Sequence, residues 1–186
     1  MKQRYIYLFL LFVIVAPLRT DAAPARNAAR SAAGGYDSSF QKGYNFPSWW
    51  HDSYLQSWAT ESLTQIPDHG TTWIGVVPFW YQKDRGSSRI APHKDRTASD
   101  ASVEHIIKKI HERGFKVMLK PIVDPENGKW RGGFHPDNAT QWFADYTAMA
   151  VHYARMAERL GVASYEFGSE YETMTVSKYD QQWRSV

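Results

Sequence analysis

The sequence predicts an α/β protein in which helices alternate with parallel strands that are buried on both faces. Three segments share one pattern: a helical stretch ends on a glycine, and an apolar, β-rich run follows at once. Gly70 precedes "TTWIGVVPFW", Gly114 precedes "FKVMLKPIV" and Gly161 precedes "VASYEFG". Glycine just past a helix end readily takes the left-handed conformation. Continuous apolar runs, rather than alternating ones, are typical of strands covered on both sides.

Four strands are expected, and three helices between them. The strands are placed at residues 42–46, 72–79, 116–121 and 163–168, and the first and weakest helix at 53–66. A capping-box-like Thr97-Ala98-Ser99-Asp100 predicts the start of the second helix. Val103, Ile106, Ile107 and Ile110 mark one apolar face of that helix at helical spacing.

The third helix is predicted to begin near Asp137 or Asn138. Its apolar stripe is wide enough to pack on a sheet, so its aromatic residues are expected in the core rather than on a cofactor. The stripe consists of Trp142, Phe143, Tyr146, Met149, Ala150, Tyr153, Met156, Ala157 and Leu160. Asn138-Ala139-Thr140 is also a glycosylation sequon, usable only in a eukaryotic host.

Strand–helix alternation implies parallel strands joined by right-handed crossovers, either in an open doubly wound sheet or in a (β/α)₈ barrel. The first strand is followed by "GYNFPSWW" rather than by a glycine-rich phosphate turn, which disfavours a nucleotide-binding open sheet. A complete barrel takes roughly 250 residues. We therefore expect residues 41–186 to form a partial (β/α)₈ TIM barrel of about the first four βα units, with the carboxyl-terminal half missing.

The first 40 residues are expected to precede this domain. Lys2 and Arg4 stand before a short apolar run at residues 5–17, and Thr20-Asp21-Ala22 offers small residues for cleavage. This order predicts a secretory signal peptide at 1–22, with an uncleaved signal anchor as the alternative. Residues 23–40 are mostly small and predict a flexible leader. The protein is thus expected to be secreted, with no membrane attachment after cleavage.

Composition disfavours several classes of function. The formal net charge is +3, and it falls to +1 without residues 1–22, because three positive charges and one negative charge leave. So small a charge disfavours nucleic-acid binding. The 7 histidines are scattered and the chain has no cysteine, so neither a metal site nor a cofactor is expected. No Gly-x-Ser-x-Gly nucleophile elbow occurs.

In a barrel, functional residues gather where strands end and βα loops begin. Reading those ends gives one set of candidate substrate-binding residues and one candidate catalytic acid. The binding candidates are Trp80, Lys120, Asp124, Trp130 and Arg131. Indole faces stack on the CH faces of sugar rings and charged groups bind hydroxyls, so the set suits a polyhydroxylated ligand. For each tryptophan the alternative is packing under a long loop.

Glu170 is the catalytic candidate, because it closes the strand "YEFGSE". Shielding by aromatic neighbours can raise the pKa of such a carboxyl enough for it to donate a proton near neutrality. The alternative is a surface acid, or a salt bridge to Lys120 or Arg131. Glu166 shares the inward side of this strand with Gly168, which predicts a structural pairing with an inward lysine.

The quoted segments "KGYNF", "TTWIGVVPFWYQ", "TASD", "VMLKP", "WRGGF", "WFADYTAMAVHYARMAE" and "EFGSE", in this order, resemble the amino-terminal half of glycoside hydrolase family 113. The resemblance covers about residues 41–175. It implies a retaining β-mannanase barrel that acts on β-mannan polysaccharide or oligosaccharide. It also implies that Glu170 is the general acid/base and that Lys120, Trp130 and Arg131 lie near the substrate cleft.

The same resemblance implies a nucleophilic glutamate at the end of a seventh strand, which these residues do not contain. Retaining hydrolysis needs two carboxyl groups about 5–5.5 Å apart. The chain is therefore expected to be a truncated hydrolase that is inactive as it stands. A non-catalytic carbohydrate-binding protein is one alternative, and a hydrolase of the same clan acting on another β-glycan is a second.

Overall fold

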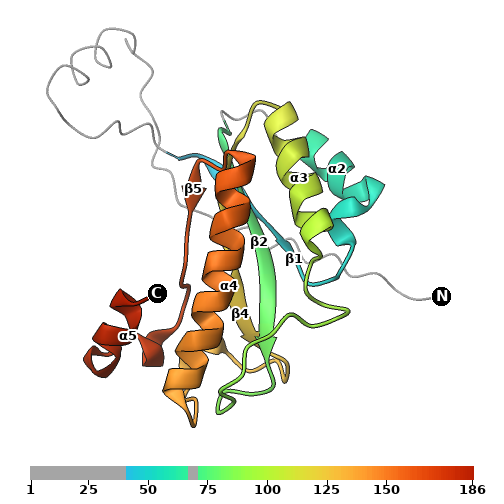
Figure 1. Ribbon diagram of the computed structural model, residues 1–186. Helices are drawn as coiled ribbons and strands as arrows, with labels where there is room; N and C mark the ends of the chain where they lie inside the picture. Colours follow the sequence, from blue (N-terminus) through green and yellow to red (C-terminus); the bar gives the residue numbers. More distant parts are fainter. Residues whose placement is uncertain (1–40, 67–70) are drawn as a thin grey trace, which may run out of the picture. The chain divides into compact units, whose positions relative to one another are not determined.

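The computed structural model describes residues 41–66 and 71–186, which form a parallel sheet with helices on one of its faces (Figure 1). The signal peptide, the leader and Gly70 lie outside the described residues. Among the described residues, no helix is both long and apolar enough to cross a membrane.

The sheet has the strand order β1-β2-β3-β5, with β4 paired to β2 beyond the end of β3. Its strands are β1 (Gly43–Ser48), β2 (Trp73–Gln82), β3 (Lys116–Leu119), β4 (Ile122–Pro125) and β5 (Ser164–Tyr165). Every pair is parallel: β1 with β2, β2 with both β3 and β4, and β3 with β5. The predicted partial barrel of adjacent parallel strands is thus confirmed.

Two predicted strands are shorter in the structure, whereas β1 and β2 run further than expected, to Ser48 and Gln82. The third is interrupted at Lys120 and Pro121, because proline has no N–H to donate to the ladder. The fourth was expected at 163–168, but β5 is only Ser164–Tyr165. Its pairing extends by one hydrogen bond on each side, from Ala163 N to Val117 O and from Glu166 N to Leu119 O. Beyond Glu166 the partner strand β3 has ended.

The helices are α2 (Ser57–Thr64), α3 (Asp100–Glu112), α4 (Ala139–Leu160) and α5 (Asp180–Arg184). Short 3₁₀ turns are η1 (Ser53–Leu55), η2 (Arg131–Gly133), η3 (Glu172–Met174) and η4 (Ser177–Tyr179). The helix predicted at 53–66 is divided into η1 and α2, since Gln56 between them has an extended backbone (φ −75°, ψ 145°).

Helix ends follow the sequence signals with one exception. Asn138 caps α4, where its side chain accepts a hydrogen bond from Gln141 N at 3.1 Å. Gly114 and Gly161 have the expected left-handed φ of 78° and 66°. The capping box at Thr97 is wrong: Ser99 caps α3, and Thr97 instead donates to Phe79 O at 2.7 Å. Thr97 thereby ties the loop before α3 to β2.

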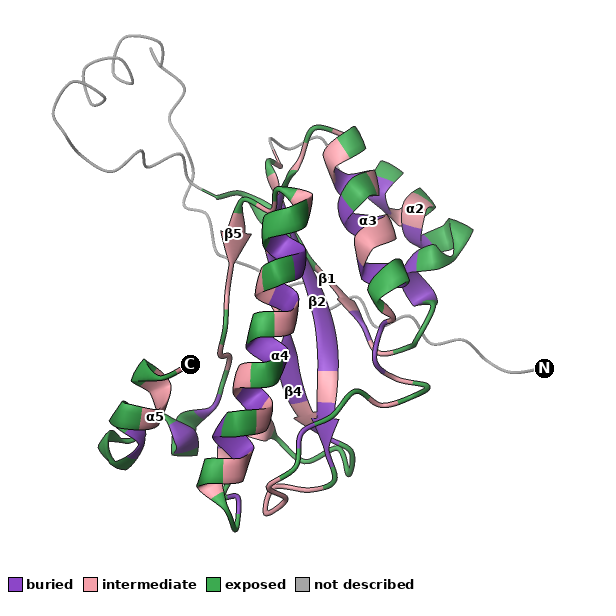
Figure 2. Ribbon diagram, in the orientation of Figure 1, coloured by how far each residue is buried: buried purple, intermediate pink, exposed green. Residues whose placement is uncertain are grey.

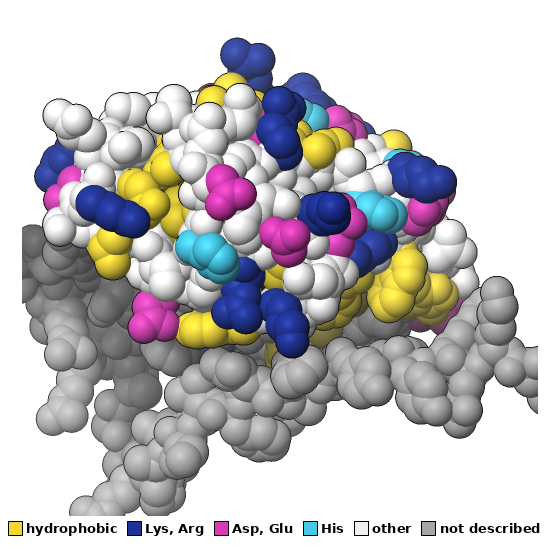
Figure 3. Space-filling view, turned by 90° about the horizontal axis from the view of Figure 1, so that it is seen from below, with side chains coloured by type: hydrophobic (Ala, Val, Ile, Leu, Met, Phe, Trp, Pro, Cys, Tyr) yellow, Lys and Arg dark blue, Asp and Glu magenta, His cyan; other side chains and the backbone are white. Residues whose placement is uncertain are grey.

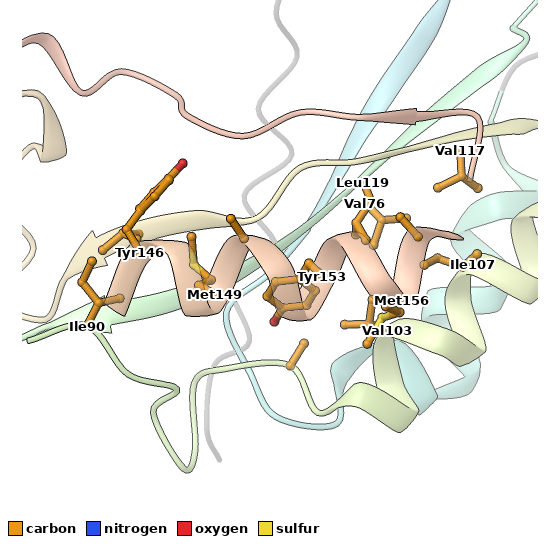
Figure 4. Close-up of a cluster of buried hydrophobic side chains, with 14 of the residues drawn as sticks. Val76, Ile90, Val103, Ile107, Val117, Leu119, Tyr146, Met149, Tyr153 and Met156 are labelled. Carbon is orange, nitrogen blue, oxygen red and sulfur yellow. The ribbon is translucent and has the colours of Figure 1, made fainter. Parts of the chain in front are cut away.

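The main core lies between the sheet and the helices (Figure 2). Val76, Val117 and Leu119 face Met149, Tyr153 and Met156 of α4, and Val103 and Ile107 of α3 complete the layer (Figure 4). The predicted stripe on α4 is buried from Trp142 to Ala157. The opposite face of the sheet, which we call the inner face, carries a smaller cluster of Val77, Phe79, Tyr81 and Ile122.

Candidate active site

Acidic, basic and hydrophobic side chains lie side by side on the surface at the carboxyl ends of β2 and β4 (Figure 3). Three of them form an ion-pair cluster, which we call the Arg131 triad. Arg131 Nε donates to Asp124 Oδ1 at 2.7 Å, and Arg131 Nη1 donates to Glu170 Oε2 at 2.7 Å. Asp124 comes from β4, Arg131 from η2 and Glu170 from the segment after β5.

Arg131 is the fixed centre of this triad, because its side chain is only 19% exposed whereas that of Glu170 is 56% exposed. Burial alone would lower the pKa of Arg131, but its hydrogen bond to Asp124 and the charges of Asp124 and Glu170 raise the pKa above its ordinary value. The guanidinium is therefore a permanent cation at the centre of the cluster.

Aromatic rings form the floor beneath the triad on the inner face. The Arg131 guanidinium lies 6.0 Å from the centroid of Phe79, and Trp49 stacks on the same ring at 5.1 Å with an interplanar angle of 22°. Phe79 was not among the residues expected at the site, because β2 is apolar at both parities; it shares the inner face with Val77 and Tyr81. A cation over an aromatic face is a favourable arrangement.

Glu170 itself has an unusual backbone. Its φ of 60° makes it the one non-glycine residue with positive φ among residues 41–66 and 71–186. This left-handed conformation costs an L-residue with a Cβ about 1–2 kcal/mol. Strained residues persist only where their surroundings hold them in place, and they cluster at functional sites.

The residues that follow Glu170 keep it in this conformation through their own contacts. Tyr171 is 3% exposed, and its hydroxyl accepts a hydrogen bond from Val123 N at 2.8 Å. Its ring stacks on Phe134 at 5.8 Å. The Thr173 hydroxyl lies within hydrogen-bonding distance of Gly132 O, at 3.0 Å, and of Phe134 O, so that it can donate to either carbonyl. Val123 precedes Asp124 and Gly132 follows Arg131, so these two side chains fix Glu170 relative to both of its triad partners.

Lys120 forms a second, separate ion pair on the inner face. Its Nζ lies 3.0 Å from Glu166 Oε1, which confirms the expected pairing of Glu166 with an inward lysine. Within the described part of the chain, no hydrogen bond or ion pair links this pair to the Arg131 triad.

The prediction that Trp80 lines the mouth is wrong. Trp80 lies on the helix side of β2, where it contacts His152 at 6.1 Å and Tyr153 at 6.4 Å between ring centroids. It has the same strand parity as Ile74 and Val76, and so it packs with them against α4. Trp130 is 56% exposed and directly precedes Arg131 in the chain.

Within the triad, Glu170 is the exposed member, whereas Arg131 and Asp124 are largely buried. Two cavities, of about 430 and 400 Å³, occur elsewhere among the described residues, one along α3 and α4 and one beside Phe167 and Trp183. Over the same residues, no group of three or more histidine or acidic side chains is arranged to hold a metal ion. The chemistry available at the triad is therefore that of carboxylates, a guanidinium and aromatic faces.

The sequence model of glycoside hydrolase family 113 matches residues 44–186. The chain belongs to glycoside hydrolase family 113. Its fold is similar to that of a GH113 β-mannanase, AaManA from Alicyclobacillus acidocaldarius, solved in complex with ManMIm (TM-score 0.74, 26% identity, 80% of this chain and 50% of that chain).

Another solved GH113 β-1,4-mannanase complex, at 24% identity, supports the fold alone (TM-score 0.72, 78% of this chain and 50% of that chain). This GH113 chain thus spans about half the length of the solved structures that it matches. No curated protein matches it. Membership of GH113 places the triad in a fold whose catalytic residues sit at the carboxyl ends of the strands, where Glu170 is found.

Proposed function

We propose that this GH113 chain forms the acid/base half of an endo-β-1,4-mannanase site in a secreted protein. In this proposal Glu170 protonates the leaving glycosidic oxygen and later removes a proton from the attacking water. The observation that carries it is the placement of Glu170: an exposed carboxylate after β5, held in a left-handed conformation beside Arg131. Family membership and the two β-mannanase folds support the substrate class.

The triad suits a proton-transferring carboxylate because the side chain of Glu170 is 56% exposed, whereas that of Asp124 is 18% exposed. Donating a proton requires the carboxyl form of Glu170, which cannot keep its ion pair with Arg131. Arg131 stays in place when that pair opens, since its Nε remains bound to Asp124 at 2.7 Å. Glu170 can therefore turn toward a bound sugar without disturbing the rest of the site.

The nucleophile is proposed to come from a part of the barrel that these residues do not supply. Asp124 is joined to Glu170 through Arg131, but the guanidinium lies between the two carboxylates, where a sugar would have to sit. Glu166 is paired with Lys120. General acid help alone gives about 10²–10⁴-fold, whereas enzymes reach about 10⁶–10¹⁷-fold.

A second candidate is carbohydrate binding without hydrolysis. The exposed indole of Trp130 and the pairing of Glu170 with Arg131 favour it. A site of this kind would need the sugar contacts of the cluster but no proton transfer. A third candidate keeps hydrolysis in the complete barrel but replaces mannan with another β-glycan.

One set of measurements separates these candidates. We would titrate the purified chain with mannohexaose and cellohexaose by calorimetry, and assay reducing-sugar release from mannan by the chain and by Glu170→Ala. The proposal expects mannohexaose binding with no useful release from either protein. Release that disappears in Glu170→Ala would contradict the absence of a nucleophile, and stronger binding of cellohexaose would contradict the substrate class. Secretion is tested by sequencing the amino terminus of exported protein, which should begin at Ala23.

A further inference from the structure

Trp130 lies with one face of its indole against the backbone of Gly132. A Cβ built on Gly132 would come within 2.5 Å of Trp130 Cε2 and closer still to Cζ2 and Cη2. Three consecutive ring atoms at nearly equal distance mean that the Cβ would meet the ring through its face, not at its edge. Trp130 is 56% exposed, so much of its surface remains open although one face of the indole lies on Gly132.

Only glycine allows this arrangement at position 132. A larger residue would clash with Cζ2, Cη2 and Cε2 on the six-membered ring of the rigid indole, which can clear a Cβ only by moving as a whole. Gly132 has no positive φ, so its requirement for glycine comes from this contact and not from its backbone conformation.

The same glycine is also tied to the segment that carries Glu170. Its carbonyl lies 3.0 Å from the Thr173 hydroxyl, three residues after Glu170. The neighbouring Arg131 binds Glu170 directly at 2.7 Å. Gly132 thus contacts the indole through its Cα and the Glu170 segment through its carbonyl, and so it fixes one relative to the other.

We propose that Gly132 is a positioning residue that mounts Trp130 as a flat platform for one pyranose ring of the substrate next to Glu170. This inference rests on the proposed carbohydrate site. The ligand class is a sugar ring that presents a face of axial C–H groups, which stacks on an indole face and not on its edge. Gly132 does not touch the sugar; it acts through the orientation of Trp130.

Four variants test this role. Trp130→Ala removes the platform, and Gly132→Ala keeps the indole but displaces it. Thr173→Val removes the hydrogen bond to Gly132 O without introducing a steric clash. Gly133→Ala is the matched control, because the atoms nearest its Cβ belong to the flexible side chain of Arg85, with Nη1 at 2.5 Å, and that side chain can move away. Each variant is titrated with mannohexaose, and its near-ultraviolet circular dichroism and Tm are recorded.

Trp130→Ala and Gly132→Ala are expected to weaken mannohexaose binding by about threefold to tenfold, the value of one aromatic contact. Gly132→Ala should also lose the Trp130 dichroism, identified as the difference between the parent chain and Trp130→Ala. Gly133→Ala should change neither. If Gly132→Ala does not fold, Thr173→Val should still weaken binding and reduce that signal.

The outcomes distinguish the inference from the proposed function. A parent chain that binds mannohexaose with variants that bind equally well overturns the role of Gly132 and leaves the proposed function standing. Full affinity in Gly132→Ala despite a lost Trp130 signal also overturns it. A parent chain that binds no oligosaccharide overturns both.

Discussion

The strained backbone of Glu170 predicts that glycine is tolerated better than glutamine at this position. At φ 60°, a side chain with a Cβ costs about 1–2 kcal/mol, and glycine escapes that cost. Glycine in turn loses about 0.5–1 kcal/mol through the greater freedom of the unfolded chain. Glu170→Gly and Glu170→Gln both lose the ion pair to Arg131. We therefore expect Glu170→Gly to be more stable than Glu170→Gln by about 0.5–1 kcal/mol.

Glu172 provides the matched control, since it is exposed, two residues away and has no positive φ. There Glu172→Gly should be less stable than Glu172→Gln, by about 0.5–1 kcal/mol. The difference between the two sites, about 1–2 kcal/mol, isolates the backbone strain. Guanidinium unfolding followed by tryptophan fluorescence measures all four variants. If glycine is no better at position 170 than at position 172, the strain at Glu170 is not real.

Three further predictions concern the fold. Asn138→Ala should lower the free energy of unfolding by about 1 kcal/mol, whereas Asn138→Asp, which keeps the cap on α4, should match the parent in urea unfolding. Burial raises the pKa of several tyrosines, that of Tyr81 to about 12. The free energy of unfolding should therefore be constant below about pH 10 and fall above it, by about 1.4 kcal/mol per pH unit for each such tyrosine. A free energy of unfolding that stays constant from pH 9 to 11 would contradict this. A double-mutant cycle with Lys120→Met and Glu166→Gln should give a coupling of about 0.2–1 kcal/mol, and no coupling would mean that the pair is not formed in solution.

The sequence predicted the order of the strands because each βα unit carries its own local signals. The apolar run of β2 and the left-handed glycines Gly114 and Gly161 are local, and they need no knowledge of the rest of the chain. The signal for the strand break at Pro121 is also local, but the apolar runs before Lys120 and after Pro121 favoured one continuous strand. Ser99 rather than Thr97 caps α3, because the Thr97 hydroxyl donates a hydrogen bond to Phe79 O in β2, which is distant in sequence.

The candidate site was predicted by position but not by orientation. Strand ends identified Asp124, Arg131 and Glu170, and the structure brings these three together. The prediction for Trp80 was wrong because β2 is apolar at both odd and even positions, so its sequence does not indicate which side of the strand faces the helices. The positive φ of Glu170 and its support by Thr173 depend on tertiary contacts that no local pattern encodes.

The central claim is that Glu170 is the carboxylate that faces the glycosidic oxygen of a bound mannoside. An affinity label tests this without turnover: the carboxylate oxygen of the facing residue displaces bromide from N-bromoacetyl β-mannosylamine and forms an ester. Peptide mass mapping should find the label on Glu170, suppressed by mannohexaose and absent from Glu170→Gln. Label on Glu166 or Glu172, or label on Glu170 that mannohexaose does not suppress, would contradict the account.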